Sequence, residues 1–340
     1  MISTLDLFCG GGGSSLGASR AGATIVGAVD AWDIAADTFA DNFPEAQVRN
    51  RRLHRRSNGR LFGDIKKLDL LLASPECTNH TCARGTLDWD ESSRETALYV
   101  LNYARAFKPR WLVIENVIQM RNWDRYEGLL EALRVDYKVK AQVLDAANFG
   151  VPQSRRRLFI LCDRERDPPD LSAYRAITSP TARDILDPQG TWKAGPLHKE
   201  GRSADTLARA DRAIAELGKG VPFLIVYYST DGGGGWQRLD RPLRTLTTLD
   251  RFGLVEWQGR EATLRMLQVP ELQRAMGFTK DYKLNQGSRR DRIKLLGNGV
   301  CPPVMEKIVA ALTGIQAETR VEHQDTAIST EIKMPLAAVA

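Results

Sequence analysis

The sequence lacks several features that would assign it to a familiar class of protein. It has no uninterrupted apolar run of about 18 residues, the length that a membrane-spanning helix needs. Its first residues, MISTLDLFCGG, lack a basic leader followed by an apolar stretch and a cleavage site, so we expect no secretory signal. Its five cysteines are odd in number and scattered along the chain. This pattern argues against a disulfide framework and for a reducing compartment.

Charge is evenly balanced along the chain except in one stretch. The 340 residues are 43% hydrophobic and 26% charged, as in a soluble globular chain with a sizeable core. The formal net charge is +6, and residues 49–60 (RNRRLHRRSNGR) alone contain six arginines and no acid. Such a local excess suits contact with a polyanion such as DNA or RNA, and the alternative is a solvated arginine-rich loop.

The first 165 residues alternate short apolar runs with helical patterns, which predicts an α/β domain with a parallel sheet. The predicted strands span residues 3–8, 24–31, 68–75, 110–117, 138–146 and 155–163. The predicted helices span residues 15–23, 34–44, 95–107 and 126–135.

The remaining residues predict a second, β-rich region and a return to helix. Residues 166–264 contain short β-like runs at 223–229, 243–249 and 253–257, together with the loop DGGGGWQRLDRP. From about Arg265 the pattern is helical again, at 270–278 and 302–315. The tail at 316–340 is polar and without a clear period, so we expect it to be loosely ordered.

A glycine run, Gly10 to Gly13, joins the first predicted strand to the first predicted helix. Glycines at such a turn let a ligand approach the backbone at a helix N-terminus. Asp30 ends the next predicted strand, where a carboxylate can accept hydrogen bonds from ribose hydroxyls. The run lacks the spacing of a dinucleotide or P-loop motif, so it predicts a nucleoside-containing cofactor, with a tight structural turn as the alternative.

Polar side chains also follow the later predicted strands. Cys77 lies in a loop after the strand at 68–75, where a thiolate could act as a nucleophile or a thiol could simply be buried. Cys77, His80 and Cys82 raise the question of zinc, but no fourth ligand lies at a convincing spacing, so we expect no metal.

Glu115 ends an apolar run, and desolvation there would raise its pKa toward neutrality. Arg155 and Arg157 alternate onto one face of the next predicted strand, where two guanidinium groups could hold a carbonyl or an anion. A solvated loop acid and a charged edge strand are the alternatives.

Together these segments resemble the DNA (cytosine-5)-methyltransferase family in order and spacing. The segments that carry the resemblance are DLFCGGGG, GDI at 63–65, PEC at 75–77, ENV at 115–117, GVPQSRRRLFIL at 150–161, RMLQVPELQRAMGFTKDY at 265–282 and GNGV at 297–300. The resemblance implies a Rossmann-like S-adenosylmethionine methyltransferase domain at 1–165 and 265–315, and a target-recognition domain at 166–264.

The resemblance also implies roles for individual residues. Cys77 would be the nucleophile that attacks carbon 6 of a flipped cytosine, Glu115 the acid at ring nitrogen 3, and Arg157, with Arg155 behind it, the holder of the base carbonyl. The expected cofactor-binding residues are Phe8, Gly10, Gly12, Asp30, Trp32, Asp64, Glu76 and Asn298. The expected substrate-binding residues are Asn116, Gln153, Trp236, Arg238, Arg241 and Arg244.

One departure from the family pattern lies beside the nucleophile. The family usually has proline before this cysteine, whereas this chain has Glu76. A carboxylate next to the thiol would oppose thiolate formation. The departure therefore keeps open the transfer of a modified one-carbon group.

The resemblance implies S-adenosylmethionine as cofactor, duplex DNA as substrate and a cytoplasmic location, at the bacterial nucleoid or in a phage-infected cell. It also implies restriction-modification, with a cognate restriction endonuclease as a partner, and we expect a monomer that binds no membrane. A tRNA cytosine-5 methyltransferase on the same fold and a non-catalytic DNA-binding relative are the alternatives. The five residues Cys77, Glu115, Arg155, Arg157 and Asn298 together argue against the non-catalytic one.

Overall fold

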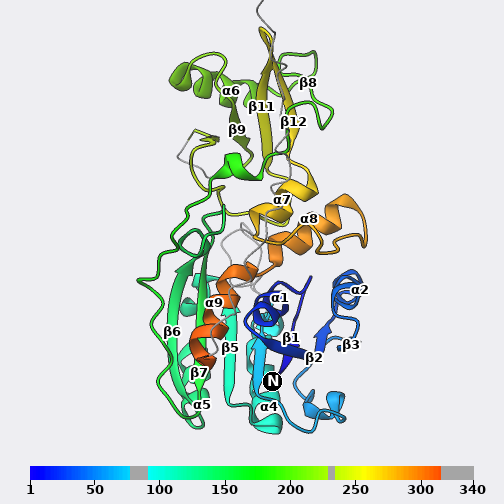
Figure 1. Cartoon of the computed structure of the whole chain (residues 1–340), viewed down its shortest axis with the longest axis vertical. Coiled ribbons are helices and arrows are strands. Elements are labelled where there is room, and N and C mark those ends of the chain that lie inside the picture. Colours follow the sequence, from blue (N-terminus) through cyan, green and yellow to red (C-terminus); the bar gives the residue numbers. More distant parts are fainter. Residues whose placement is uncertain (77–90, 229–233, 315–340) are drawn as a thin grey trace, which may run out of the picture.

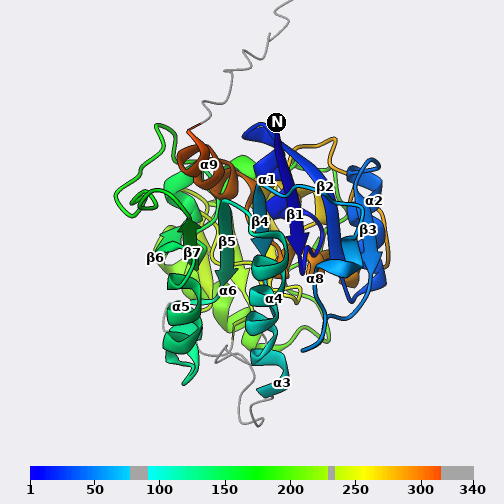
Figure 2. The same ribbon diagram turned by 90° about the horizontal axis from the view of Figure 1, so that it is seen from below.

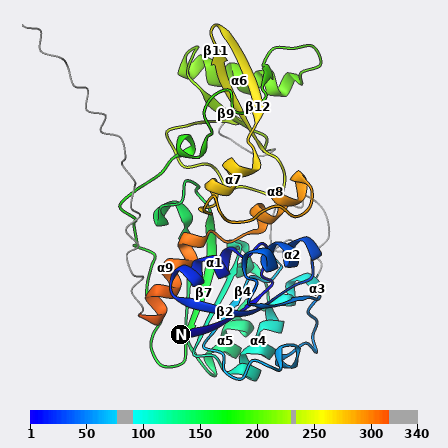
Figure 3. The ribbon, with the colours of Figure 1, turned by 45° about the vertical axis from the view of Figure 1, so that its right-hand side comes forward.

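The computed structural model describes residues 1–76, 91–228 and 234–314, which form two β-sheets with helices around and between them (Figure 1). The larger sheet occupies the lower half of Figure 1, and the smaller sheet the upper half. The two sheets come from different parts of the chain, and the helices α7 and α8 lie between them (Figure 3).

The larger sheet has seven strands in the order β3-β2-β1-β4-β5-β7-β6. β1 to β5 pair in parallel, whereas β7 is antiparallel to both β5 and β6. The chain builds outward from β1 to β3 and then returns to β4 on the other side of β1, so β1 and β4 flank a topological switch point. The strands are β1 (Ile2–Leu7), β2 (Ala23–Asp30), β3 (Gln47–Asn50), β4 (Leu70–Ala73), β5 (Trp111–Asn116), β6 (Lys138–Asp145) and β7 (Arg156–Asp163).

Helices cover both faces of this sheet, with α1 and α9 together on one face and α4 and α5 on the other (Figure 2). Successive strand residues alternate between the two layers: Leu70 and Val113 pack toward α1 and α9, whereas Leu71 and Leu112 pack toward α4 and α5. Burial on both faces explains why the central strands β4 and β5 have nearly continuous apolar sequences. The helical elements before β8 are α1 (Gly13–Arg20), α2 (Asp33–Asn42), η1 (Gly59–Phe62), α3 (Glu91–Arg94), α4 (Thr96–Phe107), η3 (Ile118–Asn122), α5 (Tyr126–Arg134), η4 (Ala146–Phe149) and η5 (Ala182–Ile185).

The smaller sheet is antiparallel, with five strands in the order β10-β9-β11-β12-β8. Its core includes Phe223, Ile225 and Val255, and α6 covers it with Ala210 and Ala213. The sequence did not predict α6. The elements are β8 (Gly195–Pro196), α6 (Ala204–Leu217), β9 (Phe223–Val226), β10 (Trp236–Arg238), β11 (Phe252–Gln258) and β12 (Glu261–Met266).

The predicted strand at 243–249 is wrong. Only Leu243 makes an isolated bridge, and its partner is Gln153 of the other region. The segment is instead bonded along the loop before β7: the Leu243 N–H donates to the Pro152 carbonyl at 2.9 Å, and the Ser154 N–H donates to the Leu243 carbonyl at 2.8 Å. Leu243 and Leu246 are therefore buried at the junction between the two regions, whereas Leu249 is exposed.

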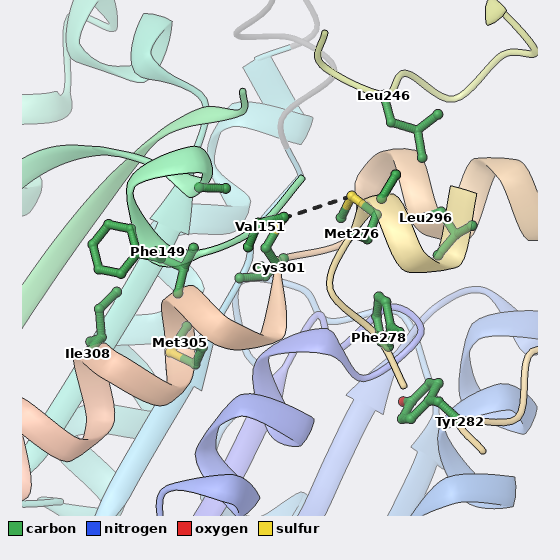
Figure 4. Packing of buried hydrophobic residues seen from close by; sticks show 14 of the residues in the cluster. Phe149, Val151, Leu246, Met276, Phe278, Tyr282, Leu296, Cys301, Met305 and Ile308 are labelled. Carbon is green, nitrogen blue, oxygen red and sulfur yellow. Dashed lines mark hydrogen bonds between the residues drawn. The ribbon is translucent and has the colours of Figure 1, made fainter. Parts of the chain in front are cut away.

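The junction is apolar and is built from segments far apart in the sequence. Val151, Met276 and Cys301 point toward one another, and the Cys301 and Met276 sulfurs are 3.9 Å apart (Figure 4). The helices here are α7 (Val269–Ala275), α8 (Arg289–Asn298) and α9 (Pro302–Thr313). The sequence did not predict α8, and β12 runs on to Met266, past the expected boundary at 264.

Residues Arg289–Thr313 are the one stretch of the described chain that is long and apolar enough to cross a membrane. They fold as α8 and α9, and 61% of their most apolar window is buried inside the protein. Core packing thus accounts for this apolar character.

Candidate active site

A cavity of about 470 Å³ opens at the carboxyl ends of β1, β2, β4 and β5, beside the switch point. We call it the main cavity. Open α/β sheets bind their ligands at this position. Its lining includes these residues that the sequence predicted: Phe8, Gly10, Asp30, Trp32, Glu76, Glu115, Arg155, Arg157 and Asn298.

The glycine turn after β1 forms one wall. Phe8 and Gly10 both have positive φ, at 57° and 52°, and a Cβ on Gly10 would meet no atom within 4 Å. The backbone there is therefore open to a ligand. Gly12 differs from this expectation: it lies outside the lining, and Phe39, Phe43 and Tyr282 occupy the space beside its Cα. Its lack of a side chain serves packing instead of cofactor contact.

Asp30 organises this wall. Its carboxylate accepts hydrogen bonds from the Gly10 and Trp32 N–H groups, each at 2.9 Å. Burial raises the pKa of this carboxyl above its ordinary value, and the two backbone donors oppose that shift. Each carboxylate oxygen accepts one of these bonds and keeps capacity for another. Asp30 thus fixes the turn and still offers acceptors to the cavity.

Trp32 and α8 form the next wall. The Lys294 ammonium lies 4.2 Å from the centroid of the Trp32 ring, and both residues line the main cavity. The sequence did not single out Lys294, because α8 itself was not predicted. Only the spacing of Ile293 and Leu296 in a polar segment hinted at that helix.

Glu76 lies on the rim, at the end of the described segment after β4. Its N–H donates to the Thr96 hydroxyl at 3.1 Å, and its carboxylate pairs with Arg52 at 3.4 Å. Arg51, Arg52 and Leu53 also line the cavity, so part of the arginine-rich segment reaches this site. Proline at position 76 could not make the bond to Thr96.

Glu115 and Arg157 form the deepest polar pair. Glu115 is 6% exposed, and the Arg157 Nε lies 3.4 Å from its Oε1. The pair forms because β5 and β7 are neighbours. Burial raises the pKa of the Glu115 carboxyl above its ordinary value, although Arg157 and Arg155 oppose the shift. A carboxyl of this kind can hold a proton closer to neutral pH.

Arg155, expected behind Arg157 as a catalytic residue, is bonded to the protein backbone. It is 3% exposed, and its guanidinium donates to the carbonyls of Leu246, Gly297 and Gly299 at 2.9, 2.7 and 3.0 Å. These donors join β7 to the 243–249 segment and to the link between α8 and α9. The geometry favours a positioning role.

Asn116 and Gln153 form hydrogen bonds within the protein. The Asn116 amide donates to the Pro75 carbonyl at 3.1 Å, which holds the segment that leads to Cys77. Gln153 is fully buried, donates to the Ala275 carbonyl at 3.0 Å and accepts from the Leu246 N–H at 2.8 Å. The sequence could not show these bonds, because Pro75 lies 41 residues from Asn116 and Ala275 lies 122 residues from Gln153.

The remaining predicted residues near the nucleophile lie elsewhere. Asp64 is exposed on a turn and does not line the main cavity. Cys77, His80 and Cys82 lie outside the described residues. Within the described residues, no group of three or more His, Cys, Asp and Glu side chains could hold a metal ion.

The predicted substrate-binding residues of the second region divide into two kinds. Trp236 packs edge-on against Phe223, with ring centroids 6.5 Å apart, so its partly buried ring packs against the core of the smaller sheet. Arg238 and Arg241 are exposed and Arg244 is partly exposed, and Arg238 pairs with Asp240 at 3.0 Å. The arginines therefore lie nearer the surface than the Trp236 ring does.

Known proteins resemble this chain in sequence and in fold. Residues 2–314 match the family described as C-5 cytosine-specific DNA methylase. The type II methyltransferase M.HgiDI of Herpetosiphon aurantiacus is 30% identical over 258 residues, 72% of this chain and 80% of that protein. M.NgoBI of Neisseria gonorrhoeae is 26% identical over 90% of this chain and 91% of its own length. The match to M1.HphI of Haemophilus parahaemolyticus, at 32% identity, spans 45% of that protein.

Solved structures agree on the fold. A mutant of Spodoptera frugiperda DNMT2 and the S. pombe Dnmt2 methyltransferase each give a TM-score of 0.66 over 92% of this chain, at 18% identity. The alignments include 100% and 99% of those chains, so nearly all of each solved fold has a counterpart in this chain. With the family match extending over residues 2–314, the chain belongs to the C-5 cytosine-specific DNA methylases, the DNA cytosine-5 methyltransferases.

Proposed function

We propose that this chain methylates carbon 5 of a cytosine flipped out of duplex DNA, with Cys77 as the nucleophile and S-adenosylmethionine, which the family implies, as cofactor. One observation carries the proposal: Asp30, Glu115 and Arg157 line a single cavity at the switch point of the larger sheet. The described segment that ends at Glu76 leads directly from this cavity to Cys77.

The main cavity fits a nucleoside-containing cofactor. Its volume of about 470 Å³ is within the usual range for small-molecule sites. Asp30 would accept hydrogen bonds from ribose hydroxyls, Trp32 would stack on the adenine, and the Gly10 backbone would allow close approach. When bound, S-adenosylmethionine supplies the electrophilic methyl group that carbon 5 accepts.

The residues of this chain would perform the remaining steps on the base. The Cys77 thiolate forms a bond to carbon 6, and the electrons of the 5,6 double bond make carbon 5 nucleophilic. Glu115 gives its proton to ring nitrogen 3, and the Arg157 cation stabilises the same developing charge. After methylation, water takes the carbon 5 proton, the Cys77 thiolate is eliminated, and the nitrogen 3 proton returns to Glu115, which restores the ring and the enzyme.

Other residues of the cavity would position these groups. Arg155 would hold β7 against the link between α8 and α9, so that Arg157 faces Glu115. Asn116 would hold Pro75, and with it the start of the segment that carries Cys77. No metal is part of this proposal.

Residues 166–264, including most of the smaller sheet, would form the target-recognition domain. Arg241 and Arg244 are its candidate base readers, because arginine is the commonest specific reader of guanine in a major groove. The relatives are named type II methyltransferases, so we propose a modification role in the bacterial cytoplasm, with a cognate restriction endonuclease as its functional partner.

The test is incubation of the protein with labelled S-adenosylmethionine and separate pools of duplex DNA and tRNA, followed by nucleoside mass spectrometry. We expect 5-methylcytosine in DNA, and a Cys77→Ser variant that transfers nothing while binding the cofactor within a few-fold of wild type. Labelled tRNA with unlabelled DNA would contradict the substrate. A product heavier than 5-methylcytosine would contradict the transferred group.

A further inference from the structure

A second cavity, of about 770 Å³, lies between residues 55–66 and the last turns of α4. The charged side chains that line it are all basic: Arg55, Arg56, Arg60, Lys66 and Arg105. Within the part of the chain that the structure describes, no carboxylate lines it and none of these five side chains forms an ion pair with an acid. We call it the basic cavity.

The segment that forms this cavity is held in place by specific contacts. The Asn102 amide, on α4, donates to the carbonyls of Arg55 and Ser57 at 3.0 and 3.1 Å. Gly59 lies so close to α4 that an added Cβ would be 2.9 Å from the Ala106 Cβ. The basic side chains are therefore presented from a fixed backbone.

Five like charges around one cavity repel one another, and no acid among the lining residues of the described chain offsets this repulsion. A bound anion would offset it. Guanidinium groups bind phosphate oxygens through paired N–H donors, which suits the three arginines on the 55–66 segment. The observations therefore favour a ligand that carries several phosphates.

The basic cavity adjoins the main cavity. Arg51 and Arg52 line the main cavity, and Arg55 lines the basic one. Three residues of extended chain span at most about 11 Å, which is the axial rise of about three phosphates along one DNA strand. A duplex bound at the main cavity thus has phosphates within reach of Arg55, at the near end of the basic cavity, and a duplex that extends past it would follow the remaining basic side chains.

We propose that the basic cavity binds backbone phosphates of duplex DNA outside the catalytic cleft, independently of sequence. This inference rests on the proposed function, because it takes duplex DNA to be the substrate. It divides the arginine-rich segment into two parts: Arg51 and Arg52 serve the main cavity, whereas Arg55, Arg56 and Arg60 bind the flank.

The test compares wild type with the triple variant R55Q/R60Q/R105Q and with a matched control, R134Q/R166Q/R175Q, which removes three exposed arginines elsewhere. DNA affinity is measured against salt with duplexes shortened from about 30 to about 10 base pairs, roughly 100 to 34 Å. We expect R55Q/R60Q/R105Q alone to lower the salt slope, by about 0.9 for each lost contact. This difference should shrink as the duplex shortens, and methyl transfer at saturating DNA should stay unchanged.

Several outcomes would overturn the proposal. If the triple variant and wild type had equal salt slopes, the basic cavity would bind no DNA phosphates. If the control variant lost as much slope as the triple variant, the effect would come from net charge and not from this cavity. A difference that persists on the shortest duplex would assign these arginines to the cleft. Displacement of DNA by micromolar inorganic pyrophosphate, but not by NaCl of matched ionic strength, would indicate a small phosphate ligand. Binding is measured separately from methylation, so failure of the proposed function would appear as slopes that change while no DNA is methylated.

Discussion

The larger and the smaller sheet use their polar residues in different ways. At the carboxyl ends of the larger sheet, Asp30, Glu115 and Arg155 are largely buried, and each has identified partners. At the end of β10 and in the loop after it, Arg238 and Arg241 are exposed, whereas the Trp236 ring packs against the core. In the first region the polar residues of the site also hold the fold together. In the second the exposed residues can change with little effect on the fold.

The largest effect should follow from Glu115→Gln, because glutamine keeps the shape but has no proton to transfer. We expect a loss in turnover of about 10²- to 10⁴-fold. Burial raises the pKa of Glu115, so the wild-type rate should fall as pH rises through that value, and the variant should lose this alkaline limb. Glu306→Gln is the control, since burial also raises the pKa of Glu306 but that residue does not line the main cavity. An unchanged alkaline limb in Glu115→Gln would assign the proton to another group.

Next in size is the contrast between Arg155 and Arg157. Arg155→Ala leaves buried carbonyls without their charged donor and should lower the free energy of unfolding by about 3 kcal/mol. Arg157→Ala should lower it by less than Arg155→Ala does, because the buried Glu115 can take up a proton once its partner is gone, and yet abolish most of the turnover. Urea denaturation and single-turnover rates measure the two effects. Wild-type stability in Arg155→Ala would refute its positioning role.

Asp30→Ala should weaken S-adenosylmethionine binding by about 1–3 kcal/mol, because the ribose hydroxyls and two backbone donors lose their acceptor. Isothermal calorimetry measures this loss. Asp33→Ala, three residues further on and exposed, should bind like wild type. Equal affinity in both variants would restrict Asp30 to closing the turn after β1.

Glu76 tests whether a rim residue acts through its backbone or its charge. Glu76→Pro removes the N–H that donates to the Thr96 hydroxyl. The loss should destabilise the segment before Cys77 by about 1 kcal/mol and so lower turnover by about tenfold at most. Thr96→Ala removes the same bond from the other side and should match it. Glu76→Gln keeps the bond and should stay near wild type. A pH–rate profile of Glu76→Gln shifted to lower pH with a higher plateau would instead show that the carboxylate opposes the Cys77 thiolate.

The smallest effect should come from the smaller sheet. Trp236→Phe should cost less than about 1.5 kcal/mol in stability and leave the recognised DNA sequence unchanged, because its ring packs against the core. R241Q/R244Q should keep stability and relax recognition. Sequencing of methylated sites reads both results, and altered recognition in Trp236→Phe would make that ring a reader after all.

Sequence patterns predicted the central strands of the larger sheet because these are buried on both faces. They missed the edge strand β3, which is not fully buried, and the antiparallel pairing of β7, which makes the expected parallel sheet a mixed one. They failed where a side chain's partner lies far along the chain: Gln153 bonds Ala275, and Arg155 bonds Gly297. The apolar residues of 243–249 were misread as a strand, because Leu243 and Leu246 are buried by contacts with the loop before β7 and not by a sheet. The helix α8 was missed since few apolar residues mark it among its charges. The strand ends of the site could thus be predicted, but the partners that orient them could not.

The bonds of Arg155 have a consequence for how the protein is made. Its three acceptors lie 91 to 144 residues later in the chain, and α9 packs on α1. During synthesis the amino-terminal strands emerge first, but the wall of the main cavity at Gly297 to Val300 is still inside or behind the ribosome. A nascent chain that ends before this segment has a sheet without a closed site. The ability to methylate DNA should therefore appear late in synthesis and in a single step, when α8 and α9 pack against the amino-terminal part of the chain.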